Sequence, residues 1–142
     1  MWTDSKFSAT EYGTRILKNL FKESIFAYPK SLYAVIETLT VMGFKANEKR
    51  YVLDYFAGSG TTGHAVINLN REDKGNRKYI LCEMAEYFNS VTKPRIEKVI
   101  YSEDWKDGKP VSRKGISQCF KYIRLEQYED TLNNLQPKNQ RL

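Results

Sequence analysis

The residues best suited to chemistry lie in one short run, YVLDYFAGSGTTGHA, at positions 51–65. Within it, Gly58, Gly60 and Gly63 have the G-x-G-x-x-G spacing of loops that let a backbone approach a pyrophosphate. Asp54 stands four residues before the first of these glycines. The ligand of this stretch must therefore suit both a loop that favours anions and a carboxylate.

A phosphate-binding P-loop is the first alternative, because Gly58 and Gly63 also match the start of that motif. The motif requires a lysine and then a serine or threonine after its second glycine. Here His64 and Ala65 occupy those positions. Without the lysine no cation would meet the transferred phosphates, so the sequence argues against nucleotide hydrolysis.

A dinucleotide such as NAD fits the spacing better. Glu83 follows Gly63 by twenty residues, where an acid commonly binds a ribose. The difficulty is Asp54, which would lie beside the pyrophosphate. Two like charges at about 5 Å repel by roughly 3 kcal/mol at an effective dielectric constant of about 20.

S-adenosylmethionine reverses the sign of that interaction, because it carries an ammonium group and a carboxylate and has no phosphate. Asp54 could accept hydrogen bonds from the ammonium group. The N–H groups at the start of the helix after the loop could meet the carboxylate, and Glu83 could accept both ribose hydroxyls. Every charge then has a partner, so the residues favour this cofactor.

These side chains require a strand, a turn and a helix in that order. The apolar run RYVLDYF (50–56) predicts a buried strand, TTGHAVINLN (61–70) a helix, and NRKYILCE (76–83) a second strand. Strand, glycine turn, helix and strand form a βαβ unit. The predicted fold class is α/β, a partial Rossmann-like fold with a parallel sheet and flanking helices.

Helices are predicted on both sides of this unit. Apolar residues at helical spacing predict a short helix from Thr14, and Ser31 is placed to cap a second helix that Gly43 ends. A further helix is predicted over residues 85–100, delayed or kinked by Pro94.

The remaining residues complete the division of the chain. CFKYIRL (119–125) alternates apolar and polar residues and predicts a last strand. We divide the chain into a helical segment (1–49), a cofactor-binding core (50–125) and a C-terminal tail (126–142). The end of this tail, QPKNQRL, is expected to fray.

Composition sets broader limits. The chain has 142 residues, of which 41% are hydrophobic and 28% charged, as in globular domains. It has no run of 18 apolar residues, and we expect a cytoplasmic protein without a membrane partner. The net charge of +6 permits a polyanionic partner without requiring one.

Other tempting residues have simpler interpretations. His64 is the only histidine, so we assign no metal site and interpret it as a polar residue of the first helical turn. Trp105 lies in a partly basic loop that could follow a phosphate backbone, although a solvated loop is the simpler alternative. Lys93, Arg95 and Lys98 are interpreted as a solvated helix face.

The sequence also resembles a known family. LDYFAGSGTTGHA resembles motif I of DNA amino-methyltransferases, and NLNREDKGNRKYILCE resembles the modification (Mod) subunits of type III restriction–modification systems. The segment before motif I, with its YPKSL, and the distal CFKYIRLEQYEDTLNNL are similar to segments of the same subunits. The resemblance to these adenine-specific DNA methyltransferases covers most of the chain.

The resemblance implies S-adenosylmethionine as the cofactor and assigns nine residues to it. Motif I supplies six of them, Glu83 takes the ribose position, and Lys30 and Ser31 take positions that meet the methionine carboxylate. Phe56 has an open alternative, because aromatic residues at a strand end often serve core packing. The motif I positions are Asp54, Phe56, Gly58, Gly60, Thr61 and Thr62.

The resemblance further implies an element that this sequence lacks. Methylation of a base amine needs a D-P-P-Y-like element to hold the flipped-out base, and none of the four prolines is doubled or follows an aspartate. In the subgroup resembled, that element precedes motif I. We therefore expect a C-terminal, cofactor-binding portion of a larger enzyme, with no catalytic residue of its own and inactive alone.

The alternative function is a non-catalytic module that binds S-adenosylmethionine or a nucleotide, or a degenerate remnant. A less favoured alternative is an NAD-binding oxidoreductase domain, and only the glycine spacing supports it. The partners implied by the resemblance are DNA, in the full enzyme, and a restriction subunit. The strand at 51–56 is expected to have an open edge, which predicts self-association or pairing with the missing catalytic half.

Overall fold

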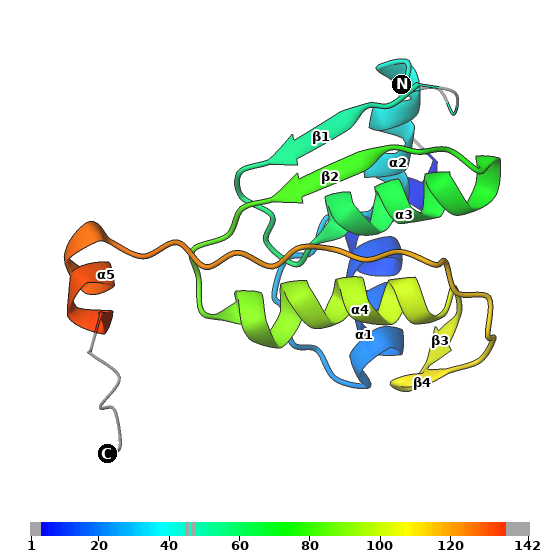
Figure 1. Ribbon diagram of the computed structural model, residues 1–142. Helices are drawn as coiled ribbons and strands as arrows, with labels where there is room; N and C mark the ends of the chain where they lie inside the picture. Colours follow the sequence, from blue (N-terminus) through cyan, green and yellow to red (C-terminus); the bar gives the residue numbers. More distant parts are fainter. Residues whose placement is uncertain (1–3, 45, 47, 136–142) are drawn as a thin grey trace.

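The computed structural model describes residues 4–44, 46 and 48–135 (Figure 1). The described residues start with a 3₁₀ turn and a π-helical turn, and a second π-helical turn, Phe88–Thr92, leads into α4. The regular elements are Ser5–Phe7, Thr10–Thr14, α1 (Arg15–Phe21), α2 (Leu32–Val41), β1 (Tyr51–Asp54), α3 (Thr61–Asp73), β2 (Lys78–Leu81), Phe88–Thr92, α4 (Lys93–Tyr101), β3 (Trp105–Lys106), β4 (Lys109–Pro110) and α5 (Tyr128–Asn134).

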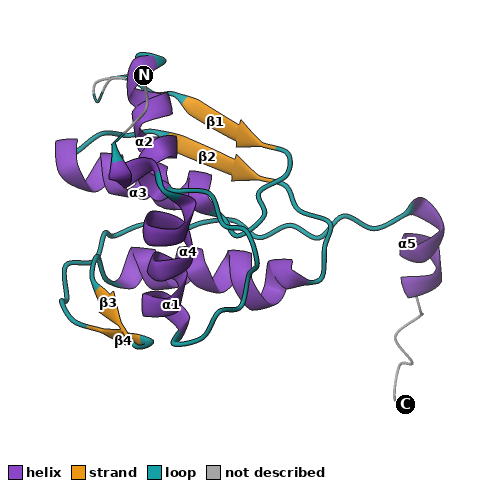
Figure 2. Ribbon diagram, turned by 180° about the vertical axis from the view of Figure 1, so that it is seen from behind, coloured by secondary structure: helices purple, strands orange, loops and turns teal. Residues whose placement is uncertain are grey.

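The strands β1 and β2 pair in parallel, with Tyr51 opposite Lys78 and Asp54 opposite Leu81. The helix α3 connects them and lies along one face of the sheet, and α4 and α1 lie beyond α3 on the same side (Figures 1 and 2). The α/β class and the parallel pairing are confirmed. A larger Rossmann-like sheet stays a prediction, because two strands do not define one.

The helix α3 lies between two halves of the core. One half joins α3 to α1 and α4, and the other joins it to α2 and the sheet. The helices of the segment 1–49 thus pack into the same core as the residues that follow. The buried residues of the two halves are Leu17, Leu20, Ile67, Ile96 and Val99, and Leu32, Leu39, Ala65, Val66 and Leu69.

The first strand is shorter and more exposed than the sequence predicted. Val52 and Tyr79 pack towards α2 and α3, whereas Tyr51, Leu53 and Ile80 are 58%, 52% and 49% exposed. Successive side chains of a strand point to opposite faces, so the exposed set lies on the face away from α3. An apolar run on both faces is typical of a strand covered on both sides, and the described residues cover only one.

The predicted strand at 119–125 is wrong. These residues run extended but form no strand, since no neighbouring strand lies along them within the described residues. The Tyr122 ring instead stacks on Phe88, with the centroids 5.8 Å apart, and the Lys93 ammonium lies 5.0 Å from the Tyr122 ring centroid. Alternation of side chains suits a strand but does not provide the hydrogen-bonding partner that a strand requires.

The tail contains a helix that the sequence did not predict. The helix α5 stands apart from the rest of the molecule at the end of this extended segment (Figures 1 and 2). The residues expected to fray, 136–142, lie outside the described residues.

A small hairpin occupies part of the predicted polar loop. Asp107 and Gly108 both have positive φ angles, 49° and 77°, and form the tight turn between β3 and β4, as Asp-Gly pairs do in two-residue hairpins. The Trp105 indole N–H donates to the carbonyls of Lys98 and Ser102, both at 3.1 Å. The Trp105 side chain therefore holds the hairpin on α4, and this use competes with stacking on a base.

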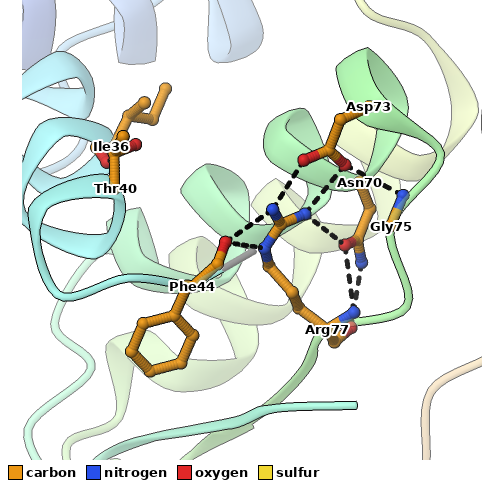
Figure 3. Close-up of polar contacts among 7 residues, drawn as sticks. All are labelled: Ile36, Thr40, Phe44, Asn70, Asp73, Gly75 and Arg77. Carbon is orange, nitrogen blue, oxygen red and sulfur yellow. Dashed lines mark hydrogen bonds and ion pairs between the residues drawn. The ribbon is translucent and has the colours of Figure 1, made fainter. Parts of the chain in front are cut away.

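The guanidinium of Arg77 ties β2 to the rest of the fold (Figure 3). It donates to the Phe44 carbonyl at 2.6 Å and to the carboxylate of Asp73 at 2.6 and 2.9 Å. The Asn70 side chain pairs with both the N–H and the carbonyl of Arg77, at 3.1 and 2.9 Å. These bonds hold the end of α3, the Phe44 carbonyl and the residue before β2 together, at the end of the sheet away from Asp54 and Glu83.

Among the described residues, no helix combines the length and the apolar character needed to cross a membrane.

Candidate cofactor site

The glycine loop between β1 and α3 adopts a conformation that favours glycine. Gly58 and Gly60 have φ angles of 53° and 81°, in the left-handed region that other residues occupy at a cost. Gly60 directly precedes α3, and no side chain of the described residues caps that helix end. The first N–H groups of α3, at Thr61 and Thr62, lack acceptors within the helix and suit an anionic group.

Asp54 ends β1 and joins the strand to the first turn of α3. Its Oδ2 accepts a hydrogen bond from the Thr62 hydroxyl at 2.6 Å, and its Oδ1 accepts one from the Phe56 N–H at 3.1 Å. A carboxylate has about four acceptor positions, so about two are left for a ligand. The carboxyl end of a parallel strand is where ligands bind in open α/β sheets.

Glu83 lies just beyond β2 and holds the glycine loop from the other strand. Its Oε2 accepts from the Gly58 N–H at 2.9 Å, and its Oε1 accepts from Met84 and Ala85 at 2.9 and 3.1 Å. Burial raises the pKa of Glu83, but hydrogen bonds from the Ala85 and Gly58 N–H groups, the Tyr87 hydroxyl and the Met84 N–H together leave the pKa below its ordinary value. The backbone N–H groups use three acceptor positions and the Tyr87 hydroxyl also hydrogen-bonds to this carboxylate, so a ribose hydroxyl would have to compete with Tyr87 for the fourth position.

Thr92, which directly precedes α4, contacts the glycine loop. The Thr92 hydroxyl donates to the Gly58 carbonyl at 2.6 Å. A Cβ atom added to Gly60 would lie 3.3 Å from the Thr92 Cγ2 atom, so the loop backbone rests directly on this side chain. Sequence reasoning did not identify Thr92.

The interpretation of Arg95 as part of a solvated face is wrong, because its side chain is 0% exposed. Its guanidinium donates to the Ser59 carbonyl and hydroxyl and to the Thr61 hydroxyl, at 3.2, 2.9 and 3.0 Å. Arg95 lies four residues after Val91 and four before Val99, both of which are buried. That helical spacing was the signal that could have placed Arg95 on the inner face.

His64 lies in the first turn of α3, as predicted, and its side chain is buried. Its Nδ1 lies 3.3 Å from both Nε and Nη2 of Arg95. Burial, followed by the positive charges of Arg95 and Arg71, holds the pKa of His64 well below its usual value of 6.5. The imidazole is therefore neutral at pH 7. The part of the chain that the structure describes contains no cluster of three or more potential metal ligands.

This histidine predicts a loss of stability in mild acid. The unfolded chain takes up a proton at its His64 near pH 6.5, whereas the folded chain does so only at lower pH, so acid favours unfolding. Lowering the pH from 7.5 to 5.5 should decrease the free energy of unfolding by about 1.4 kcal/mol. Urea denaturation at several pH values measures this slope.

The control for this prediction is His64→Gln, which should remove most of the slope between pH 7.5 and 5.5. Asp73 and Glu83 have lowered pKa values in the folded chain. The stability that they contribute is lost only as the pH falls below about 4.5, and so lies outside this window. An equal slope in both proteins would contradict the role assigned to His64.

Ser31 caps α2, as predicted. Its hydroxyl accepts from the Ala34 N–H at 3.4 Å and donates to the Lys6 carbonyl at 2.8 Å. The side chain is buried. Within the described residues this hydroxyl therefore serves the fold, and its contact with a cofactor carboxylate stays a prediction.

Lys30 is exposed and lines a shallow depression together with Thr14 and Tyr28. No hydrogen bond or ion pair recorded among the described residues joins Lys30 to the glycine loop. The same segment does reach the loop through Phe26, whose ring lies 3.5 Å from the position of a Cβ atom added to Gly58. The predicted role of Lys30 stays a prediction.

Phe56 does not pack in the core of the described residues, because its side chain is 83% exposed. Tyr55 and Met84, at the ends of the two parallel strands, are also exposed. The alternative of core packing is therefore wrong for Phe56. Exposed apolar side chains therefore follow both Asp54 and Glu83 in the sequence.

Comparison with known proteins identifies the class. The DNA methylase family matches residues 15–94, which contain α1, α2, both strands of the parallel sheet, α3 and the glycine loop. This match covers more than half of the chain. The chain therefore belongs to the DNA methylase family.

Individual relatives narrow the resemblance. The chain is 41% identical, over 58% of its length, to the type II methyltransferase M.KpnI of Klebsiella pneumoniae, of which it covers 19%. It is 35% identical, over 85% of its length, to the Mod subunit of the type III restriction–modification enzyme EcoPI of Escherichia phage P1, of which it covers 17%. A third relative, the StyLTI Mod subunit of Salmonella typhimurium, is 35% identical over 60% of the chain and is covered to 13%.

These relatives confirm the resemblance to type III Mod subunits. The chain spans less than a fifth of the length of each of the three. DNA methyltransferases of this family use S-adenosylmethionine in general.

Proposed function

We propose that this chain is the S-adenosylmethionine-binding portion of a DNA adenine methyltransferase of the type III modification type. The observation that carries the proposal is the hydrogen bond between Asp54 and Thr62, which joins the end of β1 to the start of α3 beside the glycine loop. This arrangement sets a carboxylate next to the unpaired N–H groups of a helix. It suits a ligand that carries both an ammonium group and a carboxylate.

The described residues fit that cofactor. Asp54 would accept from the ammonium group with the positions that Thr62 and Phe56 leave free, and the first turn of α3 would meet the carboxylate. Glu83 would accept one ribose hydroxyl, and Phe56 offers exposed apolar surface to the base. When bound, the cofactor supplies an electrophilic methyl group on its sulfonium, and these residues hold and orient it.

The acceptor amine would be held by residues outside this sequence, since the sequence lacks a D-P-P-Y-like element. We propose that a further polypeptide segment completes the site and binds DNA. The relatives are more than five times as long as the matched region, and so contain enough residues for such a segment. The chain alone is then expected to transfer no methyl group. A restriction subunit is the partner proposed for the complete enzyme by analogy with the Mod relatives.

Calorimetric titration tests the cofactor. S-adenosylmethionine and S-adenosylhomocysteine should bind to the chain with comparable affinity, because both carry the ammonium group, the carboxylate and the ribose. NAD should not bind, because its pyrophosphate would lie beside Asp54. Binding of NAD alone would overturn the proposal in favour of a dinucleotide domain.

Methyl transfer from labelled cofactor to DNA tests the rest of the proposal. The chain alone should leave mixed DNA unlabelled, and addition of the complementary catalytic part should restore transfer. Label transferred by the chain alone would contradict its dependence on other residues. Cofactor binding without restored transfer would favour a non-catalytic module.

The open face of the sheet predicts self-association. Leu53 and Ile80 are exposed on that face, and the described residues add no third strand to β1 and β2. Exposed apolar faces and unpaired strand edges attract other chains. Light scattering should show dimers or larger species at high concentration, and Leu53→Lys should shift them towards monomer.

Val111→Lys is the matched control for this prediction. Val111 is also exposed but lies beside the β3–β4 hairpin rather than on the sheet face. It should leave the association unchanged. A monomer at all concentrations of the unaltered chain would count against the prediction.

A further inference from the structure

Arg95 places a buried positive charge beneath the glycine loop. Buried arginines usually pair with an acid. Within the described ranges, however, no carboxylate is recorded within ion-pair distance of Arg95. Its recorded partners are neutral groups of the loop and of the first turn of α3, and they belong to Ser59, Thr61 and His64.

The planar guanidinium reaches three positions at once. Its Nη1 lies 2.9 Å from the Ser59 hydroxyl, 3.2 Å from the Ser59 carbonyl and 3.0 Å from the Thr61 hydroxyl. Its Nε and Nη2 lie 3.3 Å from the imidazole Nδ1 of His64. These three positions span the change from loop to helix, so one side chain sets the path of the backbone there.

Keeping this charge away from water is costly. Burial lowers the pKa of Arg95 from its ordinary value to about 9. Apolar side chains of similar volume often replace buried charges without loss of stability. Packing between α3 and α4 alone therefore does not explain why a charged side chain occupies this buried position.

The hydrogen bonds of the neighbouring residues Gly58 and Thr62 offer an explanation. Thr62, which directly follows Thr61, turns its hydroxyl to Asp54, and Gly58, which directly precedes Ser59, gives its N–H to Glu83. Gly58 and Thr62, which are bonded to Glu83 and Asp54, therefore lie directly before Ser59 and directly after Thr61, which Arg95 holds. Loss of the Arg95 bonds to Ser59 and Thr61 would therefore allow Gly58 and Thr62 to move as well.

We propose that Arg95 is a positioning residue for the proposed cofactor site, which holds Ser59, Thr61 and His64 so that Asp54, Thr62 and the first N–H groups of α3 face the ligand. The inference rests on the proposed function for its effect on binding. Its effect on the loop itself does not depend on which ligand binds.

Arg71 offers a matched control. It also joins α3 to α4, because its guanidinium donates to the Val99 carbonyl at 2.6 Å and to the Asn68 side chain at 2.7 Å. No contact recorded for Arg71 among the described residues involves the glycine loop. Arg71→Met therefore removes a comparable link between the same helices and leaves the loop supported.

Amide hydrogen exchange in the chain without ligand is the first test. Arg95→Met should speed exchange at the hydrogen-bonded amides of Gly58, Gly60 and His64 by about tenfold or more relative to Arg71→Met, because opening of the loop costs less free energy once its support is gone. Arg95→Lys should recover part of the protection, since an ammonium group keeps the charge but loses the planar fork. Unchanged exchange at the loop in folded Arg95→Met would overturn the inference.

A second variant covers the case in which Arg95→Met does not fold. Ser59→Ala removes one acceptor of Arg95 and leaves the guanidinium in place. It should speed exchange at the same amides by a few-fold relative to the unaltered chain, because the other bonds of Arg95 remain. Loop protection equal to that of the unaltered chain in both Ser59→Ala and Arg95→Lys would also overturn the inference.

Cofactor affinity is the second test, measured well below the unfolding temperature of every variant. Arg95→Met should weaken S-adenosylmethionine binding by about tenfold to a hundredfold, the range found when residues that orient metal ligands are removed. Arg71→Met should change it by less than about twofold. Equal affinity in Arg95→Met and the unaltered chain would overturn the inference and leave the proposed function standing.

The two failures are distinguishable. If the unaltered chain binds no S-adenosylmethionine, the proposed function fails, and hydrogen exchange still decides whether Arg95 holds the loop. Faster exchange confined to the loop would then support the inference without the cofactor.

Discussion

Asp54→Asn is expected to weaken the binding of S-adenosylmethionine by about tenfold to a hundredfold. A hydrogen bond to a charged group contributes about 1.5–3 kcal/mol, and asparagine keeps the shape of the side chain while it removes the charge. The amide also presents an NH₂ group, which would face either the Thr62 hydroxyl or the Phe56 N–H in place of an acceptor. Calorimetric titration of both proteins measures the difference.

Glu86→Gln is the control for this substitution. Glu86 is an exposed carboxylate three residues after Glu83, and its side chain has no recorded partner among the described residues. It should leave the affinity for the cofactor unchanged, which separates the role of Asp54 from a general effect of net charge. Unchanged affinity in Asp54→Asn, or tighter binding of NADH, would refute the assignment of an ammonium group to this carboxylate.

Arg77→Met is expected to lower the free energy of unfolding by about 3 kcal/mol, since removal of one partner of a buried ion pair costs roughly 3–5 kcal/mol and Asp73 stays about one-third exposed. The substitution leaves the Phe44 carbonyl without its guanidinium donors and removes one of the two donors to the Asn70 side-chain oxygen. Urea denaturation measures the change.

Arg50→Met provides the comparison for Arg77. Arg50 pairs with Glu48 on the surface, and exposed ion pairs contribute about 0–1 kcal/mol. Arg77 also lies at the start of β2, at the opposite end of that strand from Glu83. Folded Arg77→Met should therefore bind the cofactor normally, and a loss of stability no larger than that of Arg50→Met would contradict the prediction.

The elements that the sequence predicted correctly depend on neighbours along the chain. The cap of α2 by Ser31 needs only the N–H of Ala34, three residues later. The turn of the glycine loop depends on the left-handed conformations of Gly58 and Gly60, which glycine adopts without a neighbour distant in sequence. The parallel pairing follows from the βαβ order, because a helix between two strands returns the chain in the same direction.

The incorrect predictions concern partners that are distant in sequence. The residues 119–125 have the alternation of a strand, but no strand lies beside them in the described structure. Arg95 has the composition of a solvated helix face, yet it contacts Ser59, 36 residues earlier. Helical spacing alone does not reveal that contact, because it shows which face is buried but not what covers it.

The order strand, glycine loop, helix and strand is readable from the residues alone, and it places the carboxylates Asp54 and Glu83 at or just beyond the ends of two parallel strands. The fold adds what these carboxylates hold among the described residues, namely the Thr62 hydroxyl and the Gly58 N–H. Only it placed Arg95 under the loop. The physical reason is that spacing specifies local backbone geometry, whereas burial and hydrogen bonding depend on which distant segment packs against it.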